Sequence, residues 1–150
     1  MESFSTFALS LENITKVINK IKSLKISEFG IRIAHLNCML HIDSSKEGLS
    51  PTELSKDCGV DKAFVSRTTA DLIKGGFIQT NQKFNDGRKY RNKYILTEKG
   101  REVIRETKSL IEKYFADLSG KISEHDMSCF IRVILAINES AAVKENEIDF

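Results

Sequence analysis

Residues 50–76 read SPTELSKDCGVDKAFVSRTTADLIKGG, and this stretch predicts two short helices joined by a sharp turn. The first helix has a strong start signal in Ser50, Pro51 and Glu53. A serine can cap the first turn, a proline has no N–H to leave unused there, and a glutamate at the third position can bond back to the cap. We therefore expect a helix to begin at Pro51.

Glycines mark the expected ends of both helices. Gly59 can adopt the left-handed backbone conformation that a sharp turn between helices needs, and Asp61 just beyond it can cap the second helix. That second helix should stop at Gly75 and Gly76, because glycine caps a helix but does not sustain one. Two short helices connected in this way form a helix-turn-helix.

The two sides of the second helix differ in chemistry. One side carries Val65, Thr68 or Thr69, and Leu72 at helical spacing and should face the core. The other side carries small residues, a hydroxyl and long cations: Lys62, Ala63, Ser66, Arg67 and Ala70. Such a face suits a DNA major groove, because phosphates attract cations and base edges need donors. An ordinary amphipathic helix with a solvated polar face explains this one helix equally well.

The composition is that of a soluble globular protein. The chain has 150 residues, of which 41% are hydrophobic and 29% charged, enough for one domain with its own core. No apolar run approaches a membrane span, and the start of the chain lacks the basic residues of a secretory signal, so we expect a cytoplasmic protein. Three cysteines without a C-x-x-C pair argue against a disulfide framework and against a zinc site.

Positive charge is concentrated around the two-helix stretch. The net charge is only +2, but residues 61–100 hold nine Lys or Arg against four Asp or Glu, which leaves 14 against 17 in the other 110 residues. The local excess is therefore +5 and the remainder −3. A concentrated positive field of this kind favours binding to a polyanion.

A short hairpin should follow the second helix. Residues 77–80 and 90–96 read as strands, and Asn85-Asp86-Gly87 between them is a strong turn signal. The expected tip, residues 83–93, carries five cations against Asp86. Such a tip is often only solvated, but beside a recognition helix it favours phosphate or minor-groove contact.

Four further helices are expected, over residues 4–26, 28–42, 97–118 and from Ser123 onward. The first has a narrow apolar seam from Phe4 to Ile21 that it cannot bury alone. The last is apolar around most of its circumference. Packing on the domain's own core would explain the first helix; we favour pairing of the terminal helices with a second copy of the chain.

Three motifs support one another by their order and spacing. They are VSR at 65–67 with Leu72 and GFI at 76–78, then DGR at 86–88, and LTEKG at 96–100. They resemble the recognition helix, the D-x-R wing tip and the L-T-x-x-G helix entry of the MarR family of winged helix-turn-helix transcription regulators. The resemblance extends over nearly the whole chain.

This resemblance implies a role for individual residues. Ser66 and Arg67 would meet bases and phosphates in the major groove, Arg88 would reach the adjacent minor groove, and Asp86 would orient Arg88. An effector crevice in the family would correspond here to Arg32, His35 and Cys38. The full set of candidate DNA-binding residues is Lys62, Ala63, Ser66, Arg67, Thr69, Arg88, Lys89 and Arg91.

The implied fold is mainly α with a small β-hairpin wing, in a single domain covering residues 1–150. Residues 28–97 would form the winged-helix lobe, and residues 1–26 and 98–143 the dimerisation helices. The implied partners are double-stranded DNA with a pseudo-palindromic operator, a second copy of the chain, and a small aromatic or other effector that releases DNA. The most direct reading is a homodimeric repressor without a cofactor.

Other classes of function find less support in the sequence. The histidines form no H-E-x-x-H motif and no glycine-rich phosphate loop is present, so we expect the chain not to be an enzyme. Cys38 and His41 are three positions apart and could share a metal ion, but a place in the core or at its rim explains them more simply. A winged helix that binds an acidic protein rather than DNA remains the alternative. The first helix has no cysteine, whereas peroxide-sensing relatives keep theirs there, which speaks against a redox switch of that type.

Overall fold

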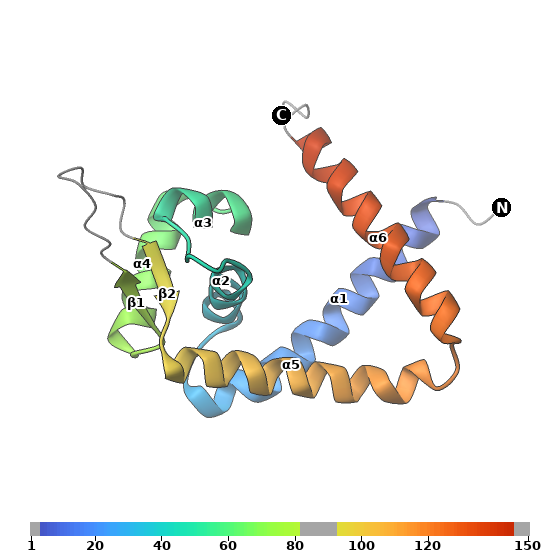
Figure 1. The fold of residues 1–150 in the computed structure, drawn as a ribbon, viewed down its shortest axis with the longest axis horizontal. Helices are drawn as coiled ribbons and strands as arrows, with labels where there is room; N and C mark the ends of the chain where they lie inside the picture. The colour runs from blue at the N-terminus through green and yellow to red at the C-terminus, as the bar shows by residue number, and fades with distance from the viewer. Residues whose placement is uncertain (1–3, 82–92, 146–150) are drawn as a thin grey trace. The chain divides into compact units, whose positions relative to one another are not determined.

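The computed structural model describes residues 4–81 and 93–145. The chain divides into two compact units, residues 1–111 and 112–150, which are considered separately below. Figure 1 shows the elements in chain order. They are α1 (Phe4–Ile26), the 3-10 helix η1 (Ser27–Phe29), α2 (Ile33–Ser44), α3 (Pro51–Cys58), α4 (Lys62–Lys74), β1 (Ile78–Asn81), β2 (Lys93–Leu96), α5 (Glu98–Ser119) and α6 (Glu124–Glu145).

The two-helix stretch folds as its capping residues predict. Ser50 and Glu53 exchange hydrogen bonds at the start of α3: the Ser50 N–H donates to the Glu53 carboxylate at 2.7 Å, and the Glu53 N–H donates to the Ser50 hydroxyl at 3.3 Å. Gly59 ends α3 with φ 63°, in the left-handed region. The Asp61 carboxylate accepts the Phe64 N–H at 2.7 Å and caps α4. The predicted helix-turn-helix is confirmed.

One buried core holds α2, α3, α4 and the strands together in the first unit. Its most deeply buried side chains come from each of these elements and from the first turns of α5. They include Leu36 and Met39 of α2, Leu54 of α3, Val65 and Leu72 of α4, Ile78 of β1 and Val103 of α5. Burial of a large aliphatic side chain contributes about 1.5–3 kcal/mol, so this cluster anchors α4 through its inner face.

The strands form an antiparallel pair in which Ile78 lies opposite Leu96 and Asn81 opposite Lys93. Leu49, just before α3, forms an isolated bridge with Tyr94 that ties the loop to the pair. The strand predicted at residues 77–80 lies one residue later, as β1. The strand predicted at residues 90–96 is described only from residue 93 onward, where it forms β2. The predicted turn at 85–87 lies outside the described residues.

The helix predicted over residues 28–42 is wrong in its first part. Residues 27–29 instead form a separate 3-10 turn, and Gly30 follows with φ 66°, so the chain changes direction before α2 begins at Ile33. A left-handed residue cannot continue a right-handed helix, which is why the apolar spacing from Phe29 onward was misleading. Residues 29–32 are consequently a bend, and this bend lines a cavity described below.

The terminal helices form where expected. Thr97 caps α5, because its hydroxyl accepts the Gly100 N–H at 3.2 Å, and Ser123 caps α6 by accepting the Asp126 N–H at 3.1 Å. In α1, Ile21 and Ile26 are buried, whereas Phe4 is 76% exposed. In α6, Phe130, Ile131, Val133 and Leu135 are about half exposed. None of the described helices is long and apolar enough to cross a membrane.

Candidate nucleic-acid interface and adjoining pocket

The outer face of α4 presents the side chains that the sequence assigned to DNA. Lys62, Ala63, Ser66 and Arg67 are all exposed, and they lie opposite the buried Val65 and Leu72. Because the inner face is locked into the core and the helix start is capped by Asp61, the orientation of this outer face is fixed by packing. Four of the candidate residues are therefore available to a partner.

Thr69 was predicted to contact DNA, and the structure contradicts this. Its residue surface is only 2% exposed, and its hydroxyl donates to the carbonyl oxygen of Val65 at 2.8 Å and lies 3.3 Å from the Tyr94 hydroxyl. Thr69 follows Val65 by four positions, about one helical turn, so it lies beside Val65 on the buried face of α4. Thr69 is a core residue that links α4 to β2.

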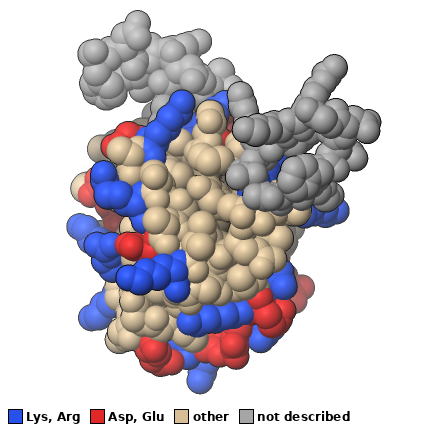
Figure 2. All heavy atoms as spheres, turned by 90° about the vertical axis from the view of Figure 1, so that its left-hand side faces the viewer, with Lys and Arg blue, Asp and Glu red and all other residues tan. Residues whose placement is uncertain are grey.

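Several cations around α4 have no acidic partner among the residues that the structure describes. Lys62, Arg67 and Lys74 belong to this group, and Asp71 is the acidic residue within the helix. Figure 2 shows the side of the molecule that carries α4 and the strands. Lys and Arg lie mainly around a largely uncharged centre, and Asp and Glu gather toward the lower edge. An unpaired guanidinium on such a face can donate to phosphate or base without first breaking an ion pair.

The wing residues of the sequence prediction cannot be placed. Asp86, Arg88, Lys89 and Arg91 all lie in residues 82–92, outside the described part of the chain. At the base of the hairpin, the Lys93 ammonium lies 3.6 Å from the Glu47 carboxylate. The structure therefore shows the α4 candidates to be exposed, and both halves of the interface remain predictions.

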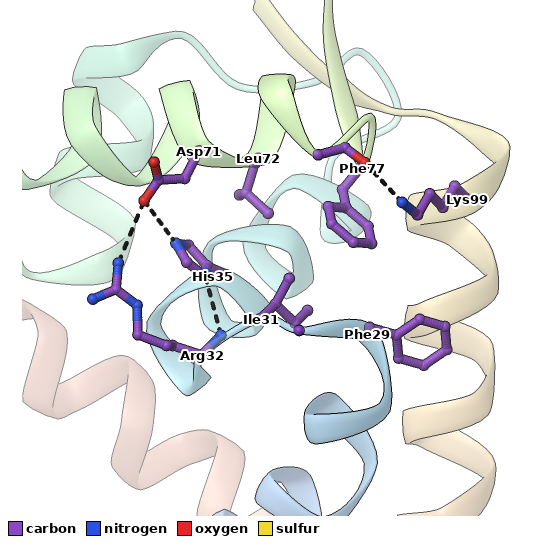
Figure 3. A pocket seen from close by; sticks show the side chains of 10 residues that line it. Phe29, Ile31, Arg32, His35, Asp71, Leu72, Phe77 and Lys99 are labelled. Atoms are coloured by element: carbon purple, nitrogen blue, oxygen red, sulfur yellow. Dashed lines mark hydrogen bonds and ion pairs between the residues drawn. The ribbon is translucent and has the colours of Figure 1, made fainter.

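A cavity of about 500 Å³ lies in the first unit, behind the C-terminal half of α4. Figure 3 shows its lining, which combines apolar rings with charged groups. The bend before α2, the end of α4 and the start of α5 supply its principal residues, which are Phe29, Ile31, Arg32, His35, Asp71, Phe77 and Lys99. Its size is within the range of pockets that hold small organic molecules.

Asp71 holds two basic side chains at the edge of this cavity. Its Oδ2 lies 3.3 Å from the Arg32 guanidinium and 3.4 Å from His35 Nε2 (Figure 3). His35 Nδ1 accepts the Arg32 backbone N–H at 3.0 Å, so a neutral His35 ring carries its proton on Nε2. His35 is 6% exposed, and its Nε2 makes no well-oriented hydrogen bond to any described residue. The buried imidazole therefore faces the Asp71 carboxylate.

Lys99 closes the opposite edge of the cavity. Its ammonium donates to the Gly75 carbonyl oxygen at 2.8 Å and lies 4.2 Å from the centroid of the Phe77 ring. A second cavity of about 510 Å³ shares Arg32 and Asp71 with the first and extends to Arg67 on the outer face of α4. The Arg32–Asp71 pair therefore borders both the pocket and the second cavity beside Arg67.

The predicted effector residues divide into two groups. Arg32 and His35 line this pocket, whereas Cys38 does not. Cys38 is buried in the core, where its Sγ lies 3.9 Å from Cys58 Sγ. Burial and the neighbouring Cys58 raise the pKa of Cys38 to about 12, and burial also raises the pKa of Cys58. Cys38 packs in the core and not in the pocket lining, which corrects the prediction.

Sequence reasoning missed Asp71, Phe77 and Lys99 as pocket residues. Lys99 lies within the LTEKG motif, and Phe77 follows the glycine pair, so both stand next to recognised signals. Asp71 is the only acidic residue of α4, and that isolated negative charge is a signal that could have marked it as a site residue. Within the described residues, no group of three or more His, Cys, Asp or Glu is placed to hold a metal ion.

The chain is similar in sequence to known regulators. No protein-family model matches it. It is 26% identical over 137 residues to the HTH-type transcriptional regulator TcaR of Staphylococcus aureus (strain Newman), covering 91% of this chain and 89% of that protein. It is 24% identical over 109 residues to the HTH-type transcriptional regulator BilQ of Clostridioides difficile (strain CD3), covering 73% and 72% respectively. These relatives are named as regulators, in agreement with the expectation that the chain is not an enzyme.

Solved structures share its fold over almost its whole length. A MarR protein from Peptoclostridium difficile aligns with a TM-score of 0.78 at 16% identity, covering 99% of this chain and 94% of that one. Staphylococcus aureus MarR in complex with salicylate and kanamycin aligns with a TM-score of 0.75 at 20% identity, covering 91% of each chain. The sequence motifs, the helix-turn-helix with its strand pair and these similarities lead to one conclusion: the chain is a winged helix-turn-helix protein with the fold of the MarR family of regulators.

Proposed function

We propose that the chain is a transcription regulator that binds double-stranded DNA in a sequence-specific way. The observation that carries the proposal is the outer face of α4: exposed Ser66 and Arg67 flanked by Lys62, on a helix whose inner face is fixed in the core. A rigid helix that presents donors and cations has the chemistry of a major-groove reader. Similarity to two proteins named as HTH-type transcriptional regulators adds support.

The finer proposal is a homodimeric repressor on a pseudo-palindromic operator. Residues 1–26 and 98–143 would pair two copies, because α1 and α6 leave large apolar side chains exposed. A two-fold dimer would place two recognition helices in successive major grooves on one face of DNA, so the half-sites should lie ~10 base pairs apart, centre to centre. Arg88, oriented by Asp86, would add a minor-groove contact from each wing, with Lys89 and Arg91 beside it.

Salt dependence tests the proposal against its alternative, a winged helix that docks an acidic protein. Affinity for promoter duplexes should fall steeply between ~50 and ~200 mM salt, because each neutralised phosphate releases counterions. Fluorescence anisotropy with labelled promoter fragments of the source genome would measure this. Weak, salt-sensitive binding without preference among fragments would favour the protein-docking alternative.

The pocket beside α4 suits an effector that combines a carboxylate with an apolar body. The exposed Arg32 guanidinium would bind the carboxylate, and Phe29 and Phe77 offer apolar surface. An anion there would compete with Asp71 for Arg32 and thereby change the groove that reaches Arg67. The Staphylococcus aureus MarR structure, solved with salicylate, makes salicylate a reasonable first probe.

Calorimetry with salicylate would test this pocket. Arg32→Ala should weaken salicylate binding, because it removes the exposed cation at the pocket edge, whereas Arg105→Ala, an exposed arginine of α5 outside the pocket, should not. Equal affinity of the two variants would contradict an effector site at Arg32.

A further inference from the structure

Two cysteines that are 20 positions apart in the sequence meet inside the DNA-binding lobe. Cys38 lies in the middle of α2, Cys58 is the last residue of α3, and their Sγ atoms are 3.9 Å apart. Both are free thiols. We propose that Cys38 and Cys58 form a disulfide site within one chain, oxidised by a low-molecular-weight disulfide, and that closing it weakens DNA binding.

The distance makes the bond reachable by a small movement. A disulfide has an S–S length of about 2.05 Å, so the two sulfur atoms must approach by about 1.9 Å. Cys58 is partly exposed at the end of a short helix, whereas Cys38 is fully buried among Leu36 and Met39 of the core. Most of the displacement should therefore occur at the Cys58 end, where the packing is looser.

The exposure of the two thiols also sets the order of the reaction. Cys58 is the reachable group, and its thiolate would attack one sulfur of the low-molecular-weight disulfide, which breaks the S–S bond and releases one small thiol after protonation. The Cys38 thiol would then lose its proton and attack Cys58 Sγ, releasing the second small thiol. Two protein thiols are oxidised by two electrons, and one small disulfide is reduced to two thiols.

Movement of Cys58 would be transmitted to α4 through the turn. The Ser55 hydroxyl donates to the Val60 carbonyl oxygen at 2.5 Å, and the Val60 N–H donates to the Ser55 carbonyl oxygen at 3.1 Å. These bonds tie the last turn of α3 to Val60, the residue that precedes the α4 cap, Asp61. A shift of the α3 end toward α2 should therefore displace the start of α4, where Lys62 and Ala63 lie.

The burial of the two thiols makes disulfide formation between Cys38 and Cys58 slow at neutral pH. Burial raises the pKa of both thiols, to about 12 for Cys38, so few thiolates exist at neutral pH. Because the thiolate is the attacking species, disulfide formation should accelerate as the pH rises toward these values. The site would respond to sustained thiol oxidation rather than to a brief pulse of oxidant.

A Cys129→Ser variant isolates the pair, because Cys129 of α6 is the only other cysteine in the chain. This variant would be incubated with oxidised glutathione, and its free thiols counted after denaturation. Both thiols should be lost without added glutathione mass, and a tryptic digest without reductant should yield residues 33–46 joined to residues 57–62. The double variant that carries Cys38→Ser as well as Cys129→Ser should instead retain a stable glutathione adduct on Cys58. Two intact thiols, a stable adduct with Cys38 still free, or a bond between chains would overturn the site.

The functional half of the inference rests on the proposed DNA binding and is measured separately. Oxidised Cys129→Ser protein should bind operator DNA several-fold more weakly than the reduced form, with recovery after dithiothreitol, and Cys58→Ser should be insensitive to oxidation. Equal affinity of the oxidised and reduced forms would overturn the link to α4. Failure of the reduced protein to bind any DNA would instead reject the proposed function, while the thiol count still decides the disulfide.

Discussion

Thr69 lies on α4, the proposed recognition helix, but its side chain belongs to the core. Its hydroxyl satisfies the Val65 carbonyl oxygen and meets the Tyr94 hydroxyl, so it joins α4 to the wing strand β2. A threonine among Ser66 and Arg67 has the composition of a groove contact, and only its position around the helix decides otherwise. Composition therefore could not separate the exposed face of α4 from its packing face, and the structure was needed to do so.

Replacing Thr69 by valine separates the two roles. Thr69→Val keeps the shape but removes a buried hydroxyl and leaves Tyr94 without this neighbour, so the free energy of unfolding should fall by about 1 kcal/mol. Urea unfolding would measure this. The preference for operator bases should remain that of the wild type, and altered specificity at one base position would contradict the core assignment.

Local signals determined where most helices begin and end, and they failed where the tertiary structure intervened. The caps at Ser50, Asp61 and Thr97 were predictable because capping depends on residues within one turn. The break at Gly30 was not, because a glycine inside an apolar pattern carries no unique signal. The pocket was only partly predictable, since Arg32, Asp71 and Lys99 come together from three separate segments.

Gly100 explains in physical terms why a glycine ends the LTEKG motif. A Cβ at this position would collide with the Phe77 carbonyl oxygen, which is backbone and cannot rotate away. Gly100→Ala should therefore force α5 away from Phe77 and lower the free energy of unfolding by about 1–3 kcal/mol. Gly120→Ala, where a Cβ has open space, is the matched control. Similar melting temperatures for the two variants would contradict this close approach.

The complete molecule is expected to function as a pair of chains. Large apolar side chains of α1 and α6 are exposed on the single chain, and they include Phe4, Phe130, Ile131 and Leu135. Exposed apolar surface is typical of contact sites between proteins. Sedimentation velocity at micromolar concentration should therefore report a dimer. Leu135→Glu should weaken it by about 2 kcal/mol or more, because a charge would replace a buried apolar contact.

Ser128→Glu provides the control for that experiment, since it adds the same charge at an exposed polar position of α6. Equal weakening by both substitutions would indicate a general charge effect rather than an apolar interface. A wild-type protein that sediments as a monomer would remove the basis for a two-fold operator.

Selection of binding sites from a random duplex DNA pool tests the central claim most directly. The wild-type protein and Arg105→Ala should enrich a pseudo-palindrome with half-sites ~10 base pairs apart. Arg67→Ala should bind the selected site about 1–3 kcal/mol more weakly if it reads a base, with an unchanged melting temperature because Arg67 is exposed. Absence of any enriched sequence, or equal affinity of Arg67→Ala and Arg105→Ala for the selected site, would contradict DNA reading by α4.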